Sequence, residues 1–133
     1  MTKIRARAGL VEVALVLVAT VAVWRLVMGW DWSVVPGPTP DSYRDPNGAF
    51  DWVLVHATAA AGTGWLAWRG RPVLGAAGVV LALVVLSGWR MAVAEVIGAN
   101  LWPVGVAMLT VTLTLTCVAA ALAGGWLRQR AHR

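Results

Sequence analysis

Long apolar runs alternate with short polar connections along the 133 residues of the chain. A helix needs about 20 mostly apolar residues to cross a membrane, because the hydrocarbon layer is about 30 Å thick and each residue rises about 1.5 Å. Four stretches meet this requirement, at about residues 8–28, 50–68, 73–97 and 101–127. The pattern predicts an all-α polytopic membrane protein, in which residues 1–133 form a single four-transmembrane-helix bundle with one long outer loop at 29–49.

Proline and glycine mark the predicted connections. Pro72 and Pro103 each fall where a helix is expected to begin, and proline is tolerated in the first turn because its missing N–H has no partner there. Three prolines of the long loop favour extended, polyproline-like backbone, and residues 45–48 match the preferences of a type I turn.

Composition supports a membrane environment. Hydrophobic residues make up 59% of the chain and charged residues 13%, with a mean hydropathy of +0.72. A water-soluble domain of this size has too few polar side chains here to cover its surface. Lipid is therefore the expected main solvent, and the bilayer the first expected partner.

The net charge of +5 is distributed in clusters between the apolar runs. With four spans, eight basic residues fall on one side of the membrane, and Arg44 alone falls in the opposite loop: Lys3, Arg5, Arg7, Arg69, Arg71, Arg128, Arg130 and Arg133. Basic residues near span ends favour the cytoplasmic side, so both termini are predicted to be cytoplasmic. The clusters form no continuous basic face, and no nucleic-acid partner is expected.

Residue usage indicates the source. Arginine outnumbers lysine ten to one, and valine and alanine far outnumber isoleucine. This bias is typical of a GC-rich bacterial genome, so the predicted location is the bacterial cytoplasmic (inner) membrane.

Nine tryptophans and many small residues suggest how the helices sit and pack. The tryptophans are expected to form aromatic belts at the two membrane surfaces, where indole rings prefer to lie. Trp24, Trp30, Trp32, Trp52, Trp89 and Trp102 are assigned to the outer surface, and Trp65, Trp68 and Trp126 to the inner one. Small residues four apart, such as Ala60 with Gly64 and Ala120 with Gly124, favour close helix contacts. The second span is predicted to be the packed centre.

Ionisable residues at membrane depth are functional candidates because burying a charge in lipid is costly. Glu12 falls near the cytoplasmic surface, within reach of Arg5, Arg7, Arg69 or Arg71, and we expect Glu12, Arg69 and Arg71 to form an inner charge anchor. The other candidates fall in the outer third of the spans: Arg25, Asp51, His56, Arg90 and Glu95.

Two arrangements of the outer residues remain open. Arg90 and Glu95 are five positions apart and point about 140° away from each other on a helix, so they are poor partners. In the first arrangement Arg25 pairs with Glu95, Arg90 pairs with Asp51 or Asp31, and His56 borders this outer polar cluster. In the second, each side chain extends separately to the headgroups.

One short segment resembles a known family. The residues AEVIG, from Ala94 to Gly98, resemble the segment around the membrane-embedded glutamate of the small multidrug resistance transporters, which are four-span proteins of similar size. In that family the glutamate lies in the first helix and three helices follow. Glu95 ends the third predicted span here, so the resemblance does not carry the family's function to this chain.

The sequence contains no arrangement typical of an enzyme. Ser/His/Asp sets, paired carboxylates on one helix face, phosphate-binding glycine loops and metal-ligand spacings are all missing from it, and Cys117 is the single cysteine. We therefore expect no catalysis and no cofactor. Four threonines in TVTLTLT are expected to bond back to carbonyls of their own helix.

Three functions remain to be compared. The leading hypothesis is a non-catalytic accessory, assembly or interaction subunit that binds a membrane protein partner or forms a homo-oligomer. The alternative is a small dimeric transporter or channel with the outer polar cluster in its vestibule. A weaker alternative is binding of a lipid, quinone or haem near His56 and the outer tryptophans.

Overall fold

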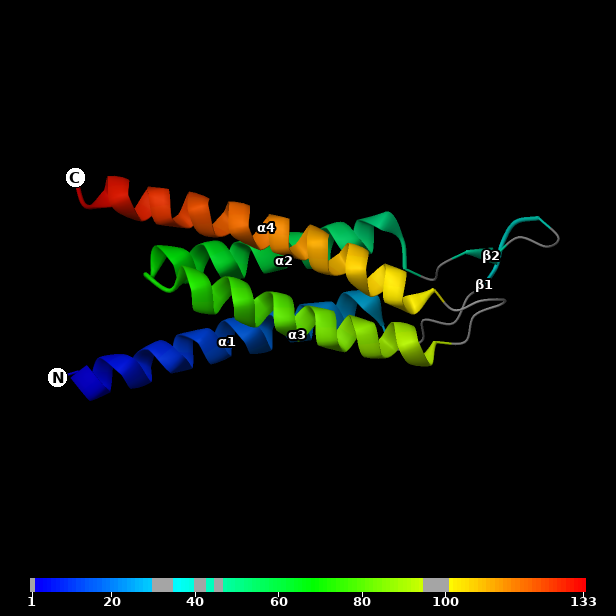
Figure 1. Ribbon diagram of the computed structural model, residues 1–133, viewed down its shortest axis with the longest axis horizontal. Coiled ribbons are helices and arrows are strands. Elements are labelled where there is room, and N and C mark those ends of the chain that lie inside the picture. Colours follow the sequence, from blue (N-terminus) through cyan, green and yellow to red (C-terminus); the bar gives the residue numbers. More distant parts are fainter. Residues whose placement is uncertain (1, 30–34, 40–42, 45–46, 95–100) are drawn as a thin grey trace.

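The computed structural model describes residues 2–29, 35–39, 43–44, 47–94 and 101–133. These residues form an all-helical fold whose helices run alternately up and down, so that both termini lie at one end of the molecule (Figure 1). The elements in chain order are α1 (Thr2–Met28), β1 (Val35–Pro36), β2 (Tyr43–Arg44), α2 (Ala49–Trp68), α3 (Pro72–Val93) and α4 (Trp102–Ala131). The all-α class predicted from the apolar runs is confirmed.

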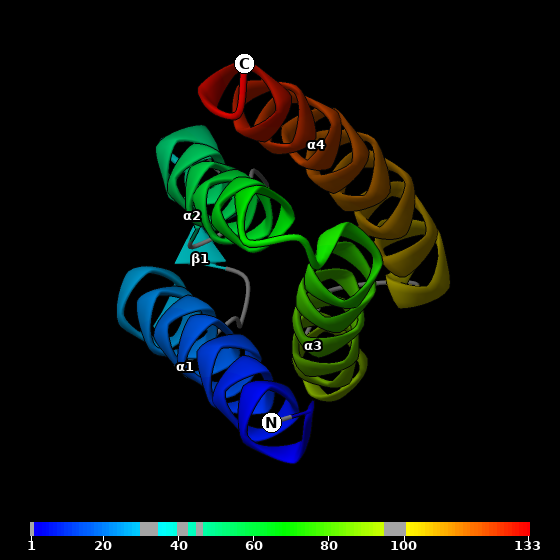
Figure 2. The ribbon, with the colours of Figure 1, turned by 90° about the vertical axis from the view of Figure 1, so that its left-hand side faces the viewer.

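The four helices stand at the corners of a quadrilateral when seen from the end that holds the termini (Figure 2). Helices α2 and α3 contact each other, and each also contacts both α1 and α4. Within the described residues α1 and α4 lie at opposite corners without contact. The centre of the bundle is therefore shared by α2 and α3, whereas the sequence suggested α2 alone.

Three of the described helices are long and apolar enough to cross a membrane: Ala8–Met28 within α1, and the whole of α3 and α4. Helix α2 has 20 residues. Its glycines, threonines and tryptophans, together with Asp51 and His56, lower its mean hydropathy. Large apolar side chains such as Leu26 (83% exposed), Leu81 (66%) and Leu115 (66%) cover the outer surface of the bundle. Lipid is the solvent that such a surface fits.

Helix ends follow local chemistry. Pro72 and Pro103 occupy the first turns of α3 and α4, as predicted. Helix α3 ends at Val93, because Ala94 is extended with φ −67° and ψ 136°. The predicted end near residue 97 is therefore too late, and residues 95–97 lie outside the described part. Helix α4 continues beyond residue 127 to Ala131.

The long loop contains a small antiparallel ladder that the sequence did not predict. Val35 pairs with Arg44, and Pro36 pairs with Tyr43. Each strand has two residues, and a proline is acceptable in such a short pair because the ladder has no further neighbour that needs its N–H. The predicted turn at 45–48 falls partly outside the described residues.

Helices α2 and α4 approach so closely that their backbones meet at two glycines. A Cβ added to Gly124 would lie 2.2 Å from the carbonyl oxygen of Gly64, which is far inside van der Waals contact. Between lipid-facing helices, close packing of this kind is a main source of association, since lipid is as apolar as the side chains. The predicted small-residue faces of these two spans do meet.

The core contains both apolar and hydroxyl-bearing side chains. Leu83, Leu113 and Val79 are fully buried in it. Threonine hydroxyls on α4 donate to carbonyl oxygens of their own helix, for example Thr110 to Val106 at 2.7 Å and Thr116 to Thr112 at 2.8 Å. With the bond from Thr112 to Leu109 O at 3.1 Å, these bonds confirm the expectation for three of the four threonines.

Candidate functional site

An ion-pair cluster joins α1 to the connection between α2 and α3. Glu12 Oε1 accepts a hydrogen bond from Arg69 Nη2 at 2.6 Å, and Glu12 Oε2 accepts one from Arg71 Nη1. The one carboxylate therefore bridges two guanidinium groups, which is the set of residues that the sequence singled out as the inner charge anchor. The hydrogen bond to Glu12 raises the pKa of Arg69, so this arginine keeps its charge.

The tight turn after α2 positions both arginines. Gly70 has φ +86°, a left-handed conformation that favours glycine. Its N–H donates to Ala67 O at 2.9 Å, and the N–H of Arg71 donates to Leu66 O at 2.7 Å. This pair of bonds is the Schellman motif that ends many helices. The turn places Arg69 and Arg71 on either side of Gly70, where both reach Glu12.

Gly9 makes room for this cluster, a role that the sequence analysis missed. A Cβ at position 9 would lie 2.1 Å from Nη2 of Arg71, so the guanidinium packs directly on the α1 backbone. Gly9 lies three residues before Glu12, and residues at that spacing share a helix face. The spacing was the available signal, but it becomes informative only when the position of Arg71 is known.

The grouping of the five outer candidates into one cluster stays a prediction. Asp51 Oδ2 accepts a hydrogen bond from the Gly48 N–H at 2.8 Å, so the carboxylate caps the start of α2. Arg25 is exposed in the last turn of α1, and Arg90 is half-buried in the last turn of α3. Glu95 lies outside the described residues, and its pairing with Arg25 stays a prediction.

His56 links α2 to α4. Its Nδ1 lies 2.9 Å from Trp52 O on its own helix, and its Nε2 lies 3.3 Å from Thr112 Oγ1 on α4. Because Trp52 O can only accept, Nδ1 carries the proton of this pair. In the described part of the chain, these bonds connect His56 to helix backbone and to a hydroxyl, and neither goes to Asp51.

A buried hydrogen bond at the same end joins α1 to α3. Trp24 Nε1 donates to Ser87 Oγ at 2.9 Å, with Trp24 only 3% exposed and Ser87 fully buried. The assignment of Trp24 to an interfacial belt is therefore wrong, since its indole lies in the core and bonds to protein rather than to water. Trp30 and Trp32 lie outside the described residues.

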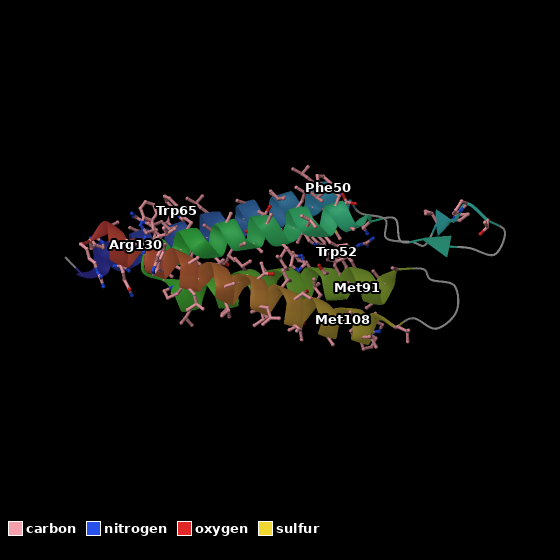
Figure 3. All side chains as sticks on the ribbon, turned by 90° about the horizontal axis from the view of Figure 1, so that it is seen from above. Phe50, Trp52, Trp65, Met91, Met108 and Arg130 are labelled. Carbon is pink, nitrogen blue, oxygen red and sulfur yellow. The ribbon has the colours of Figure 1, made fainter. Side chains whose placement is uncertain are left out.

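Five of the other belt tryptophans are exposed, as a place at the membrane surface requires, whereas Trp52 is partly buried against the core. Trp89 and Trp102 are exposed at 55% and 42%, and Trp65, Trp68 and Trp126 at 49%, 44% and 50%. Figure 3 shows Trp65 and Arg130 at the end that holds the termini, with Phe50 and Met108 toward the other end. The guanidinium carbon of Arg130 lies 3.7 Å from the centre of the Trp126 ring, a cation–π contact.

Two apolar grooves open along α4 near the end that holds the termini. The α2–α4 groove has a volume of about 590 Å³ and is lined mainly by small side chains, with Trp65 and Trp68 at one edge. The α3–α4 groove has a volume of about 550 Å³ and ends at Trp126 and Gln129. Sequence reasoning anticipated small faces but gave no sign that part of them stays uncovered.

The core between α2 and α4 also holds two polar side chains without a clear chemical role. Cys117 and Thr63 are both fully buried, and the Thr63 hydroxyl has no hydrogen-bond partner among the described residues. No group of three or more His, Cys, Asp or Glu residues in the described ranges is placed to hold a metal ion.

Comparison of the chain with protein-family models, with curated protein sequences and with solved structures gives no match.

Proposed function

We propose that this chain is a small four-span protein of the bacterial cytoplasmic membrane, with both termini in the cytoplasm, that serves as a non-catalytic accessory, assembly or interaction subunit. Support for four spans comes from the three long apolar helices and from α2, which packs against all of them. The basic residues near both termini and in the α2–α3 turn support the orientation.

The observation that carries the interaction role is the α2–α4 groove. Its walls include Ala60, Ala61 and Gly64 from α2 and Ala123 and Gly124 from α4. Side chains this small let another helix approach near to the backbone, where van der Waals contacts are most numerous.

A helix of a partner protein is the occupant that we propose. The exposed rings of Trp65 and Trp68 pack edge to face, with centres 5.2 Å apart, at the edge of the groove. They offer the partner helix a rigid apolar contact with little loss of side-chain entropy.

Filling the groove tests this role. Ala61 and Ala123 are both exposed, so Ala61→Leu and Ala123→Leu would occupy the groove without disturbing the core. Ala19→Leu is the matched control, because Ala19 is equally exposed to lipid on α1, away from the groove.

The measurement is co-purification from native membranes in mild detergent, quantified by mass spectrometry against an untagged strain. We expect a specific membrane protein with the wild type and with Ala19→Leu, and at least a tenfold loss of it with either groove variant. Purified protein with neither a specific partner nor a higher oligomer would contradict the proposal.

The orientation has a separate test. A fluorescent protein that folds only in the cytoplasm and an alkaline phosphatase that is active only in the periplasm are each fused after Arg133. We expect fluorescence from the first fusion and no phosphatase activity from the second. The transport alternative depends on Glu95, outside the described residues, and is not proposed.

A further inference from the structure

At the end that holds the termini, an apolar groove continues into a basic pocket. The α3–α4 groove is lined by side chains such as Val73, Leu122 and Trp126. The pocket beside it, about 620 Å³ in volume, lies between the α2–α3 turn and the end of α4, and is lined by Gly70, Arg128, Gln129, His132 and Arg133 among others. Pro72, Gly125 and Gln129 belong to both walls, so the two spaces are contiguous.

The pocket carries positive charge that no described acid neutralises. Glu12 and Asp51 are the acidic residues that the structure describes. Glu12 is occupied by Arg69 and Arg71, and Asp51 caps α2 at the opposite end. Within the described ranges, Arg128 and Arg133 therefore face the pocket without a carboxylate partner.

One of these arginines is held in place by the fold. The guanidinium of Arg128 packs on Gly70, where an added Cβ would lie 2.1 Å from Nη1. Because Gly70 already has the positive φ that ends α2, the same glycine both turns the chain and seats the arginine. A preorganised cation binds an anion with less loss of side-chain freedom than a mobile one.

The depth of the cavity matches a membrane surface. Trp126 lines the groove, is half-exposed and stacks with Arg130, an arrangement typical of residues at headgroup level. The basic pocket lies on the polar side of Trp126, and the apolar groove on the hydrocarbon side.

We propose that this combined cavity binds one anionic phospholipid, with its phosphate against Arg128 and Arg133 and one acyl chain along the α3–α4 groove. Basic pockets beside membrane helices on the cytoplasmic side suit such headgroups. The inference rests on the proposed membrane location but not on the accessory role, because the partner groove lies on the other side of α4, against α2.

Native mass spectrometry of the delipidated, detergent-purified protein tests the site, with phosphatidylglycerol and phosphatidylcholine titrated separately. We expect one phosphatidylglycerol to bind per chain, with affinity above that for phosphatidylcholine. Each of Arg128→Gln and Arg133→Gln should weaken binding about fivefold, the usual contribution of one basic residue beside an anionic membrane surface.

Two further variants separate a defined site from diffuse charge. Arg130→Gln removes the same charge at the same end from a residue that does not line the pocket, and should leave binding within twofold of wild type. Ala77→Leu keeps every charge but fills the groove, and should weaken lipid binding. Helicity measured by circular dichroism shows whether each variant folds. If an arginine variant does not fold, the lipid binding of Ala77→Leu tests the site in its place.

Three results would overturn the proposal: equal binding of the two lipids, an equal effect of Arg130→Gln and Arg128→Gln, or unchanged binding with Ala77→Leu.

A competition experiment adds a fourth test. Millimolar inorganic phosphate should not displace the lipid, since phosphate has no acyl chain, and displacement would indicate a site for a free anion instead. Ala61→Leu, which fills the partner groove, should leave lipid binding unchanged. The lipid measurements therefore test the lipid site alone, and the co-purification measurements test the accessory role alone.

Discussion

Gly124 and Gly125 are neighbours on α4 with opposite surroundings, and they provide a direct test of the α2–α4 contact. An added Cβ at Gly124 would lie 2.2 Å from Gly64 O and 3.0 Å from Gly64 C, whereas at Gly125 it would meet nothing within 4 Å. Both changes to alanine improve the helix propensity of α4 by about 1 kcal/mol or less, because glycine is the more flexible residue. The difference between the two variants therefore isolates the contact.

The size of that difference follows from the geometry. Ordinary van der Waals contact begins near 3.4 Å, so moving the Cβ of Gly124→Ala out from 2.2 Å requires α2 and α4 to separate by about 1.2 Å. A gap of 0.5–1 Å already removes a quarter to a half of the dispersion energy at a contact, and overpacking typically costs about 1–3 kcal/mol. We expect Gly124→Ala to be less stable than Gly125→Ala by about 2 kcal/mol.

Reversible unfolding by SDS in mixed micelles, followed by far-ultraviolet circular dichroism, measures the free energy of unfolding of each variant. Gly125→Ala should equal or exceed the wild type, and Gly124→Ala should fall below it. Equal stability of the two variants would refute the backbone contact between α2 and α4.

Three further predictions use the same unfolding assay. Ser87→Ala removes the oxygen that accepts the buried indole N–H of Trp24 and should lower the free energy of unfolding by about 1 kcal/mol. A double-mutant cycle of Ser87→Ala with Trp24→Phe should give a coupling energy of similar size. A coupling energy near zero would contradict the hydrogen bond. Glu12→Gln should lower the free energy of unfolding, because Arg69 and Arg71 lose the carboxylate that they share. Arg71→Gln should then lower it less in the Glu12→Gln background than in the wild type. Additive effects of the two substitutions would argue against the ion pair. Thr63→Val should be neutral or stabilising by about 1 kcal/mol, since it removes a buried hydroxyl that has no partner among the described residues; a clear loss of stability would show that the hydroxyl is bonded.

Features set by local sequence were predictable. The helices follow the apolar stretches, Pro72 and Pro103 lie in first turns, and three of the four threonines in the α4 run bond to their own helix. In each case the deciding residues are neighbours in the chain, so spacing and propensity are sufficient to place them.

Features that depend on the rotation of one helix against another were not predictable. Trp24 and Ser87 are 63 residues apart in the chain, and nothing in the neighbouring sequence of either residue indicates that the two are in contact. Spans that are apolar on all sides carry no periodic signal that tells the core face from the lipid face. For the same reason Trp24 was assigned to the surface, and the packing of Arg71 on Gly9 was not anticipated.

The absence of contact between α1 and α4 in the described residues bears on the order of assembly. Because α1 precedes α2 and α3 in the chain, its synthesis is complete before either of the helices that it touches has been made. In its apolar segment Ala8–Met28, the 18-residue window that qualifies it as a span is only 11% buried in the finished bundle, so the segment is suited to reside alone in lipid during that interval. Helices α2, α3 and α4 each contact the other two, so we expect this trio to keep its own contacts without α1, which adds contacts to α2 and α3 alone among the described helices.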